Sequence, residues 1–240
     1  MSRIIEKVRK ALGVEGGDGR EAAVFAKSAE FVDCGATPVS DEERDGWMKR
    51  IRAEAKALNL RVHESPDLKS CGQAIAALAA ERAPEWGTLR QIMRWSDPLL
   101  DALDLDAHLP TDIAVKTVPV AESFSETQRQ EFRREVIASY IGLTTADYLL
   151  ADTASLVLLG GRGRARSVSL VPSIHIAVVP AERMLGSYRQ LLSCLNARVL
   201  PSNVSIITGP SKTADIEATL VHGAHGPREM HLFVVTSADG

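Results

Sequence analysis

Apolar residues recur along this chain at two spacings, which predict helices and strands in alternation. Between residues 40 and 58 they gather on one face of a helix, and Ser40 with Glu43 forms a capping box at its start. The continuous apolar run at 174–179 is typical of a strand covered on both faces, and residues 230–235 provide the last strand of the set. This alternation favours an α/β fold.

The remaining elements extend the same pattern. A second capping box, Ser125 with Gln128, opens a helix that Gly142 would end, whereas residues 84–112 show no clear period. The other predicted elements are, in chain order, a strand at 60–63, a helix after Ser65-Pro66, strands at 113–118, 148–151 and 155–159, a helix after Pro180, and a strand at 204–208. We therefore expect an open, mostly parallel sheet flanked by helices, with a helical N-terminal extension at 1–59 and an α/β domain at 60–240.

The composition is that of an ordinary globular protein, with 240 residues of which 45% are hydrophobic and 25% charged. Its net charge of −3 gives no reason to expect nucleic acid or an anionic membrane as the main partner. No apolar run approaches the ~20 residues of a membrane span, and no targeting segment is evident. Cys34, Cys71 and Cys194 are far apart, which indicates neither a disulfide framework nor a self-sufficient iron–sulfur or zinc site.

Ligands of parallel sheets bind beyond the carboxyl ends of the strands, so the polar loops after the predicted strands are candidate sites. In the segment 209–217, Ser211 or Thr213 could cap a helix whose free N–H groups attract anions. Lys212 adds a positive charge, although the G-x-x-x-x-G-K-[ST] loop is absent. The segment is therefore either an anion site or a capped helix with Lys212 in solvent.

Three of the six histidines lie in the segment 222–231, together with Glu229, and could bind a metal ion. The H-E-x-x-H pattern is absent, however. Gly223, Gly226 and Pro227 favour a tight turn that leads into the last strand.

The glycine- and arginine-rich segment 160–166 looks like the start of a dinucleotide fingerprint, but its final glycine is replaced by Arg166 and a strand-like segment follows. Its arginines are expected on a mobile hairpin loop, with an acidic ligand or a partner's carboxylates near Arg166 as the alternative. Asp147 and Asp152 could form an acid/base pair if their side chains converge, or each could cap a turn. His175 lies within an apolar strand and is expected to be a hydrogen-bonded core histidine.

Five segments occur in order along the second half of the chain: 142–148 (GLTTADY), 151–157 (ADTASLV), 169–176 (SLVPSIHI), 209–217 (GPSKTADIE) and 222–231 (HGAHGPREMH). As an ordered set they resemble the lactate utilization protein C family, also called the LUD domain. The resemblance covers residues 112–236 closely, and it departs at Ala154, where the family usually has glycine. It implies a fold like that of the ribose-5-phosphate isomerase and CoA-transferase superfamily. It also implies a role, with two iron–sulfur partner subunits, in the cytoplasmic oxidation of L-lactate to pyruvate, but it carries over no catalytic residue.

Three functions remain as alternatives. The first is a cofactor-free subunit of a lactate utilization system, in which this chain binds a small anion or a partner and the iron–sulfur clusters belong to the partner subunits. The second is a free-standing enzyme acting on a phosphorylated or CoA-type substrate, and the third is an assembly scaffold. No metal site is expected, and the residues expected to bind a ligand are Thr144, Asp147, Asp152, Thr153, Ser155, Arg166, Ser169, Gly209, Ser211, Lys212, Thr213, Asp215, His222, His225, Arg228 and Glu229.

Overall fold

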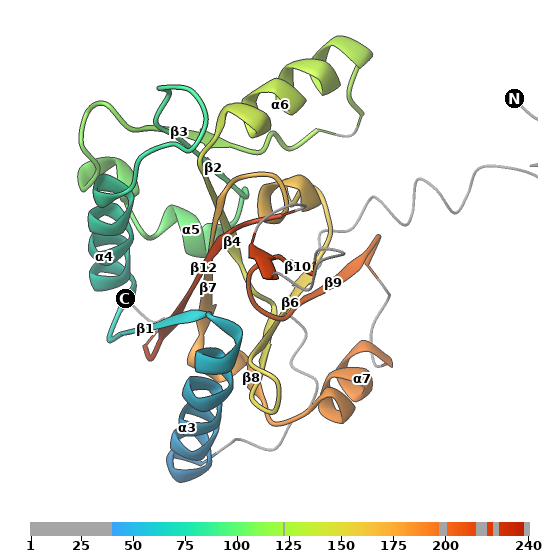
Figure 1. The fold of residues 1–240 in the computed structure, drawn as a ribbon. Helices are drawn as coiled ribbons and strands as arrows, with labels where there is room; N and C mark the ends of the chain where they lie inside the picture. The colour runs from blue at the N-terminus through green and yellow to red at the C-terminus, as the bar shows by residue number, and fades with distance from the viewer. Residues whose placement is uncertain (1–39, 122, 197–200, 215–219, 223–225, 238–240) are drawn as a thin grey trace, which may run out of the picture.

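The computed structural model describes residues 40–121, 123–196, 201–214, 220–222 and 226–237. Six strands form one all-parallel sheet in the order β1-β12-β7-β4-β2-β3 (Figure 1). Their bounds are β1 (Arg61–Ser65), β2 (Gln91–Arg94), β3 (Ala114–Thr117), β4 (Ile141–Thr145), β7 (Ile174–Pro180) and β12 (Glu229–Val235). The predicted α/β fold with an open parallel sheet is confirmed.

Two helices, α3 (Asp41–Leu58) and α4 (Leu68–Glu81), cover opposite faces of β1. Glu64 of β1 accepts from Arg52 Nε of α3 at 2.8 Å, whereas the next residue, Ser65, hydrogen-bonds to α4. Adjacent residues of a strand point to opposite faces, so the two contacts place the helices on the two sides of the sheet. The remaining helical segments are α5 (Pro98–Asp101), α6 (Glu126–Ala138), α7 (Tyr188–Asn196) and the 3-10 turns η1 (Leu105–Ala107), η2 (Arg166–Ser169) and η3 (Ala181–Arg183).

Of the two predicted capping boxes, the one at Ser125 forms completely and the one at Ser40 forms in half. Ser40 Oγ accepts from the backbone N–H of Glu43 at 3.2 Å at the start of α3. At the start of α6, Ser125 and Gln128 bond each other's backbone N–H groups reciprocally, which is a complete capping box. On α4, Cys71 is fully buried and burial raises the pKa of its thiol to about 12, so it packs as a small apolar side chain, as predicted.

Three of the strands predicted for the main sheet instead form a second sheet of four strands, in the order β8-β5-β6-β9. The bounds are β5 (Tyr148–Leu150), β6 (Ser155–Leu159), β8 (Met184–Leu185) and β9 (Val204–Ile207). Side chains alternate across the sheet: Leu156 and Leu158 of β6 join the main core, while Val157 and Leu159 belong to a smaller cluster with residues of α7. This sheet therefore lies between the main core and α7.

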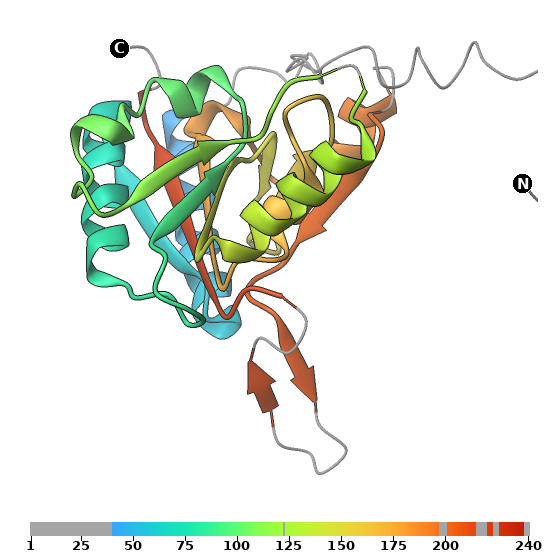
Figure 2. The same ribbon diagram turned by 90° about the horizontal axis from the view of Figure 1, so that it is seen from above.

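The segment after Thr208 does not begin a helix, contrary to the prediction. Residues 212–214 form β10 (Lys212–Ala214), which pairs antiparallel with β11 (Leu220–His222). This two-stranded hairpin projects away from the body of the molecule (Figure 2). Because its backbone N–H groups lie in a ladder, they do not form the helix terminus that was expected to attract an anion.

Three other boundaries differ from prediction. Helix α6 ends at Ala138, so Gly142 does not cap it and lies inside β4, where a Cβ atom would meet the Val168 carbonyl oxygen at 1.8 Å. The segment after Arg166 is the 3-10 turn η2 rather than a strand. The chain after Pro180 forms η3 and β8 before α7 begins. Strand β2 falls in the part of the sequence that showed no period.

The division into an extension at 1–59 and a domain at 60–240 stays a prediction. The described part of the extension is α3, whose Trp47, Ile51 and Ala55 belong to the same core cluster as the parallel sheet. The rest of the predicted extension, residues 1–39, lies outside the described residues. Within the described ranges, no helix has the length and apolar character that a membrane span requires.

Candidate functional site at the amino end of the sheet

A parallel sheet has all its strands pointing one way, so the predicted site residues can be sorted by the end at which they lie. The segments 169–173 and 226–228 precede β7 and β12 and thus lie at the amino end. Asp147 follows β4 and lies at the carboxyl end. The prediction that the polar loops meet at the carboxyl end is therefore wrong for these two segments, and it is also wrong for 209–211, which pack against 226–228.

At the amino end, the sequence-predicted segments 169–173, 209–211 and 226–229 converge. The backbone N–H of Ser211 donates to the Pro227 carbonyl at 2.8 Å, and that of Arg228 donates to the Ser173 carbonyl at 2.8 Å. A Cβ atom on Gly226 would lie 3.2 Å from Ser211 Cβ and 3.9 Å from the Leu170 carbonyl oxygen, which shows how closely the three segments pack. Three segments that are separated in sequence thus build one surface.

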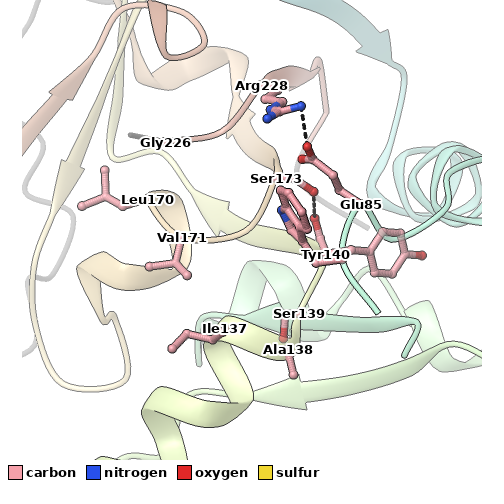
Figure 3. A pocket seen from close by; sticks show the side chains of 11 residues that line it. Glu85, Ile137, Ala138, Ser139, Tyr140, Leu170, Val171, Ser173, Gly226 and Arg228 are labelled. Atoms are coloured by element: carbon pink, nitrogen blue, oxygen red, sulfur yellow. Dashed lines mark hydrogen bonds and ion pairs between the residues drawn. The ribbon is translucent and has the colours of Figure 1, made fainter. Parts of the chain in front are cut away.

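This surface contains a cavity of about 420 Å³. Arg228 and Glu85 form an ion pair on one side, and the Ser173 hydroxyl donates to the Tyr140 carbonyl at 3.3 Å (Figure 3). Ile137, at the end of α6, lies on another side of the cavity with the apolar side chains of the η2–β7 loop. The complete lining is Glu85, Trp86, Ile137, Ala138, Ser139, Tyr140, Leu170, Val171, Ser173, Gly226 and Arg228.

Several lining residues were missed by sequence reasoning. Glu85 and Trp86 precede β2, and Ile137 ends α6, so only the parallel topology brings them beside Arg228. The one local signal was Trp86 itself, a large aromatic residue in a segment that has no apolar period.

Next to the cavity, a chain of polar side chains links β12 to the edge strand β1. His231 Nε2 lies 3.1 Å from Glu229 Oε2, and His63 Nε2 lies 3.0 Å from His231 Nδ1. The same Glu229 oxygen accepts from Arg61 and from Arg82, each at 3.1 Å. Burial lowers the pKa of His231 to about 4 and lowers that of His63, so both imidazoles are neutral at pH 7. The carboxylate of Glu229, a predicted ligand residue, is therefore already engaged by side chains of its own chain.

At the carboxyl end, Arg164 joins two buried aspartates into an ion cluster. Its guanidinium donates to Asp147 Oδ1 at 2.8 Å and to Asp97 Oδ2 at 2.5 Å. It also lies 5.5 Å from the ring centre of Trp95, while Thr145 Oγ1 donates to Asp97 at 3.0 Å. The expectation that Arg164 projects from a mobile loop is wrong, because this side chain closes the carboxyl end of β2 and β4.

Asp147 and Asp152 do not converge. Asp147 Oδ2 accepts from the backbone N–H of Leu159 at 2.7 Å, at the last residue of β6, whereas Asp152 lies in the turn before the first residue of β6. Four residues of strand separate the two ends by about 13 Å. Burial raises the pKa of the Asp147 carboxyl, an effect that the Arg164 charge opposes. The structure therefore gives no acid/base pair here.

The turn between β5 and β6 holds a small hydroxyl cluster. Ser155 Oγ lies 2.6 Å from Thr208 Oγ1 and 2.9 Å from Thr153 Oγ1, and Thr153 donates to Asp152 Oδ1 at 3.3 Å. Ala154, the position where the family usually has glycine, is buried and adopts a φ of +47°, in the left-handed region that glycine occupies at least cost. The departure from the family pattern is thus a point of backbone strain.

The other predicted ligand residues mostly satisfy local bonds. Thr144 Oγ1 lies 2.9 Å from Nε2 of His175, which is the hydrogen-bonded core histidine that was predicted. Ser169 is buried and donates to the Arg166 carbonyl at 3.0 Å, and Arg166 is exposed. Lys212 Nζ donates to the Ala57 carbonyl at 3.4 Å, at the C-terminus of α3, where a cation is favourable.

The remaining predicted residues divide into two groups. Gly209 has a φ of +82° and packs against α3, where a Cβ atom would lie 3.1 Å from Leu58 Cβ. Thr213 and His222 are placed in β10 and β11, but their side chains are outside the described part of the chain, as are Asp215 and His225. In the part of the chain that the structure describes, no three His, Cys, Asp or Glu side chains are arranged to hold a metal ion.

Comparison with known proteins agrees with the segments that form this surface. A family model described as the LUD domain matches residues 48–235. The match begins within α3 and ends at the last residue of β12, so it includes both ends of the sheet and the cavity.

Curated relatives carry the name lactate utilization protein C. The protein from Halalkalibacterium halodurans is 34% identical over 154 residues, which cover 62% of this chain and 64% of that protein. The protein from Bacillus subtilis is 32% identical over 136 residues, covering 55% of this chain and 56% of that one. The chain thus matches less than two thirds of either relative's length.

A solved structure supports the fold alone. The crystal structure of a DUF162 family protein from Deinococcus radiodurans superposes with a TM-score of 0.52 over 80% of this chain and 98% of that one, at 17% sequence identity.

Proposed function

This chain belongs to the LUD domain family, and we propose that it is a subunit of a lactate utilization system, supporting the oxidation of L-lactate to pyruvate in the cytoplasm together with iron–sulfur partner subunits. The observation that carries the proposal is the family match over residues 48–235, joined to relatives named lactate utilization protein C at 32–34% identity. In this proposal the chain binds a small anion or a partner subunit, and the electrons pass through iron–sulfur clusters in the partner subunits.

The structural support comes from where the family-like segments lie. Three of the five, at 169–176, 209–217 and 222–231, contribute residues to the amino-end surface around the cavity. Residues that pack only for stability have no need to gather around an open cavity. We therefore place the working surface of the subunit at the amino end of the sheet.

The carboxyl end gives little support to an independent enzyme. Substrates of parallel α/β sheets bind at that end, but here Arg164, Asp97 and Asp147 bond one another in a buried cluster. A phosphorylated or CoA-type substrate that approached the carboxyl ends of β2 and β4 would have to break those ion pairs, so we do not propose that function.

The experiment is a deletion of the gene in its own organism. Growth on L-lactate as sole carbon source should be lost, while growth on pyruvate is retained, because the defect precedes pyruvate. A plasmid copy of the wild-type gene should restore growth and the L-lactate-dependent dye reduction of cell extracts. Undiminished growth of the deletion strain on L-lactate would refute the proposal.

A further inference from the structure

Exposed apolar side chains are concentrated around the amino-end cavity. Four of the ten large apolar residues found exposed in the described ranges line it: Trp86 at 78%, Ile137 at 62%, Val171 at 47% and Leu170 at 41% exposed. Single exposed apolar residues are ordinary on a protein surface, whereas a contiguous group marks an interaction site. Tryptophan in particular is enriched among the residues that dominate binding energy between proteins.

The helix beside the cavity carries cations without acidic partners. On α6, Arg133 and Arg134 lie one helical turn before Ile137 and Ala138, both of which line the cavity, so the two arginines continue the same surface. Both are exposed, and neither forms an ion pair with an acidic residue in the described part of the chain. The nearby acid Glu135 pairs instead with Lys116 of β3, at 3.6 Å.

The walls of the cavity suit a polypeptide better than a small carboxylate. A small-molecule site encloses most of its ligand, about 70–90% of the ligand surface, whereas the apolar rim here is itself open to solvent. The one arginine in the lining, Arg228, is already paired with Glu85, so a free carboxylate would have to displace that partner. The unpaired positive charge lies outside the cavity, along α6.

From this arrangement we propose that the amino-end cavity and the α6 arginines form a docking site for an acidic segment of a partner protein. A large apolar side chain of that segment packs between Trp86, Ile137 and Val171, and its carboxylates face Arg133 and Arg134. The inference rests on the proposed function in one respect: the segment belongs to an iron–sulfur subunit of the same lactate-oxidising system.

The test measures binding of the purified full-length chain to the purified iron–sulfur subunits by isothermal titration calorimetry. Trp86→Ala should weaken binding at least tenfold, because it removes the central apolar contact. The double variant Arg133→Glu/Arg134→Glu should also weaken it at least tenfold at 50 mM salt and by a smaller factor at 500 mM salt, since exposed charges are screened.

Matched controls lie on other exposed helices. Lys49→Glu/Arg50→Glu makes the same charge change on α3, and Leu192→Ala removes an exposed apolar side chain from α7. Both controls should bind within twofold of wild type. Circular dichroism and melting temperature of every variant should match wild type, because the substituted side chains are exposed.

Four outcomes would overturn the docking site. If neither docking variant weakened wild-type binding, the partner would bind at another surface. If the wild-type chain did not bind the iron–sulfur subunits at all, they would not be its partner. Saturable binding of L-lactate that Trp86→Ala abolishes would identify a small-molecule site. Concentration-dependent dimerisation that Trp86→Ala abolishes would identify a second copy of this chain as the occupant. The growth phenotype of the deletion strain tests the lactate role separately, so the two failures can be told apart.

Discussion

The two ends of the parallel sheet are made by the same strands, yet they use their polar side chains in opposite ways. At the carboxyl end, the buried Asp97 and Asp147 both pair with Arg164, and the ring of Trp95 lies beside the guanidinium. At the amino end, Trp86 is largely exposed beside an open cavity. One end is closed by its own charges, and the other is available to a partner.

The difference shows that a rule about fold gives only a starting expectation for the location of function. Parallel α/β sheets usually bind ligands at the carboxyl ends of their strands. Here the described charges at the ends of β2 and β4, Arg164, Asp97 and Asp147, are already paired with one another. Charged residues therefore indicate a binding site only where the fold leaves them unpaired.

The largest expected effect is a loss of stability when the ion cluster at the carboxyl end is broken. Arg164→Met leaves Asp97 and Asp147 buried without a cation, which should lower the free energy of unfolding by about 3–5 kcal/mol in urea denaturation. Arg166→Met, an exposed arginine on the adjacent turn, should change it by less than about 0.5 kcal/mol. Equal effects of the two substitutions would contradict a structural role for the cluster.

The next effect concerns the buried histidine near the amino end of β7. Burial lowers the pKa of His175 to about 3, below its value of 6.5 in a model peptide, so between these pH values the unfolded chain binds a proton that the folded chain does not. Unfolding is therefore favoured as the pH falls, and His175 alone should cost about 2 kcal/mol of stability by pH 5.

Urea denaturation from pH 7.5 to 5 measures this loss. His175→Gln keeps a polar side chain beside Thr144 but does not titrate in this range, so its stability should depend less steeply on pH. His231, with a pKa lowered to about 4, acts in the same direction and remains as an internal reference in that variant. An unchanged slope in His175→Gln would show that this histidine is not the source.

A smaller effect tests the strained turn between β5 and β6. Ala154→Gly relieves a positive φ and should stabilise the chain by about 0.5–1 kcal/mol, measured as a higher urea midpoint. Ala151→Gly, at a buried position of the same turn where φ is not positive, should instead destabilise it by about 0.5–1 kcal/mol. Destabilisation by both substitutions would show that the strain at Ala154 is negligible.

The smallest effect is expected at the open end. Arg133→Glu/Arg134→Glu should change the free energy of unfolding by less than about 0.5 kcal/mol, because both side chains are exposed and unpaired in the described chain. Thermal unfolding of the double variant checks this. A loss above about 1.5 kcal/mol would mean that the arginines support the fold, and the contrast between the ends would be lost.

Much of the fold could be predicted because its signals are local. The capping box of Ser125 with Gln128 and the apolar run of β7 act within a few residues, and both form as expected. Strand β4 was missed because Gly142 also suits a helix end, and only its packing under the Val168 carbonyl shows why glycine is required. The helix predicted after Ser211 does not form, because pairing of β10 with the distant β11 outweighs the local capping signal.

The site was harder to predict because it depends on distant pairings. The sequence identified Arg228 and the segment 169–175, but it could not show that Trp86 and Ile137 lie beside them. Likewise, His63 and His231 meet only because β1 pairs with β12, across 168 residues of sequence. Local patterns carry no information about such contacts.

That pairing has a consequence for how the protein is made. Strand β12 lies between β1 and β7, so β1 has no neighbour in the sheet until the last described strand has left the ribosome. Folding must therefore finish after synthesis of residue 235, and such long-range closure is slow. A sheet of the other four strands, in the order β7-β4-β2-β3, would leave β7 as an extra edge until β12 is made, and such incomplete intermediates are the ones that chaperones protect.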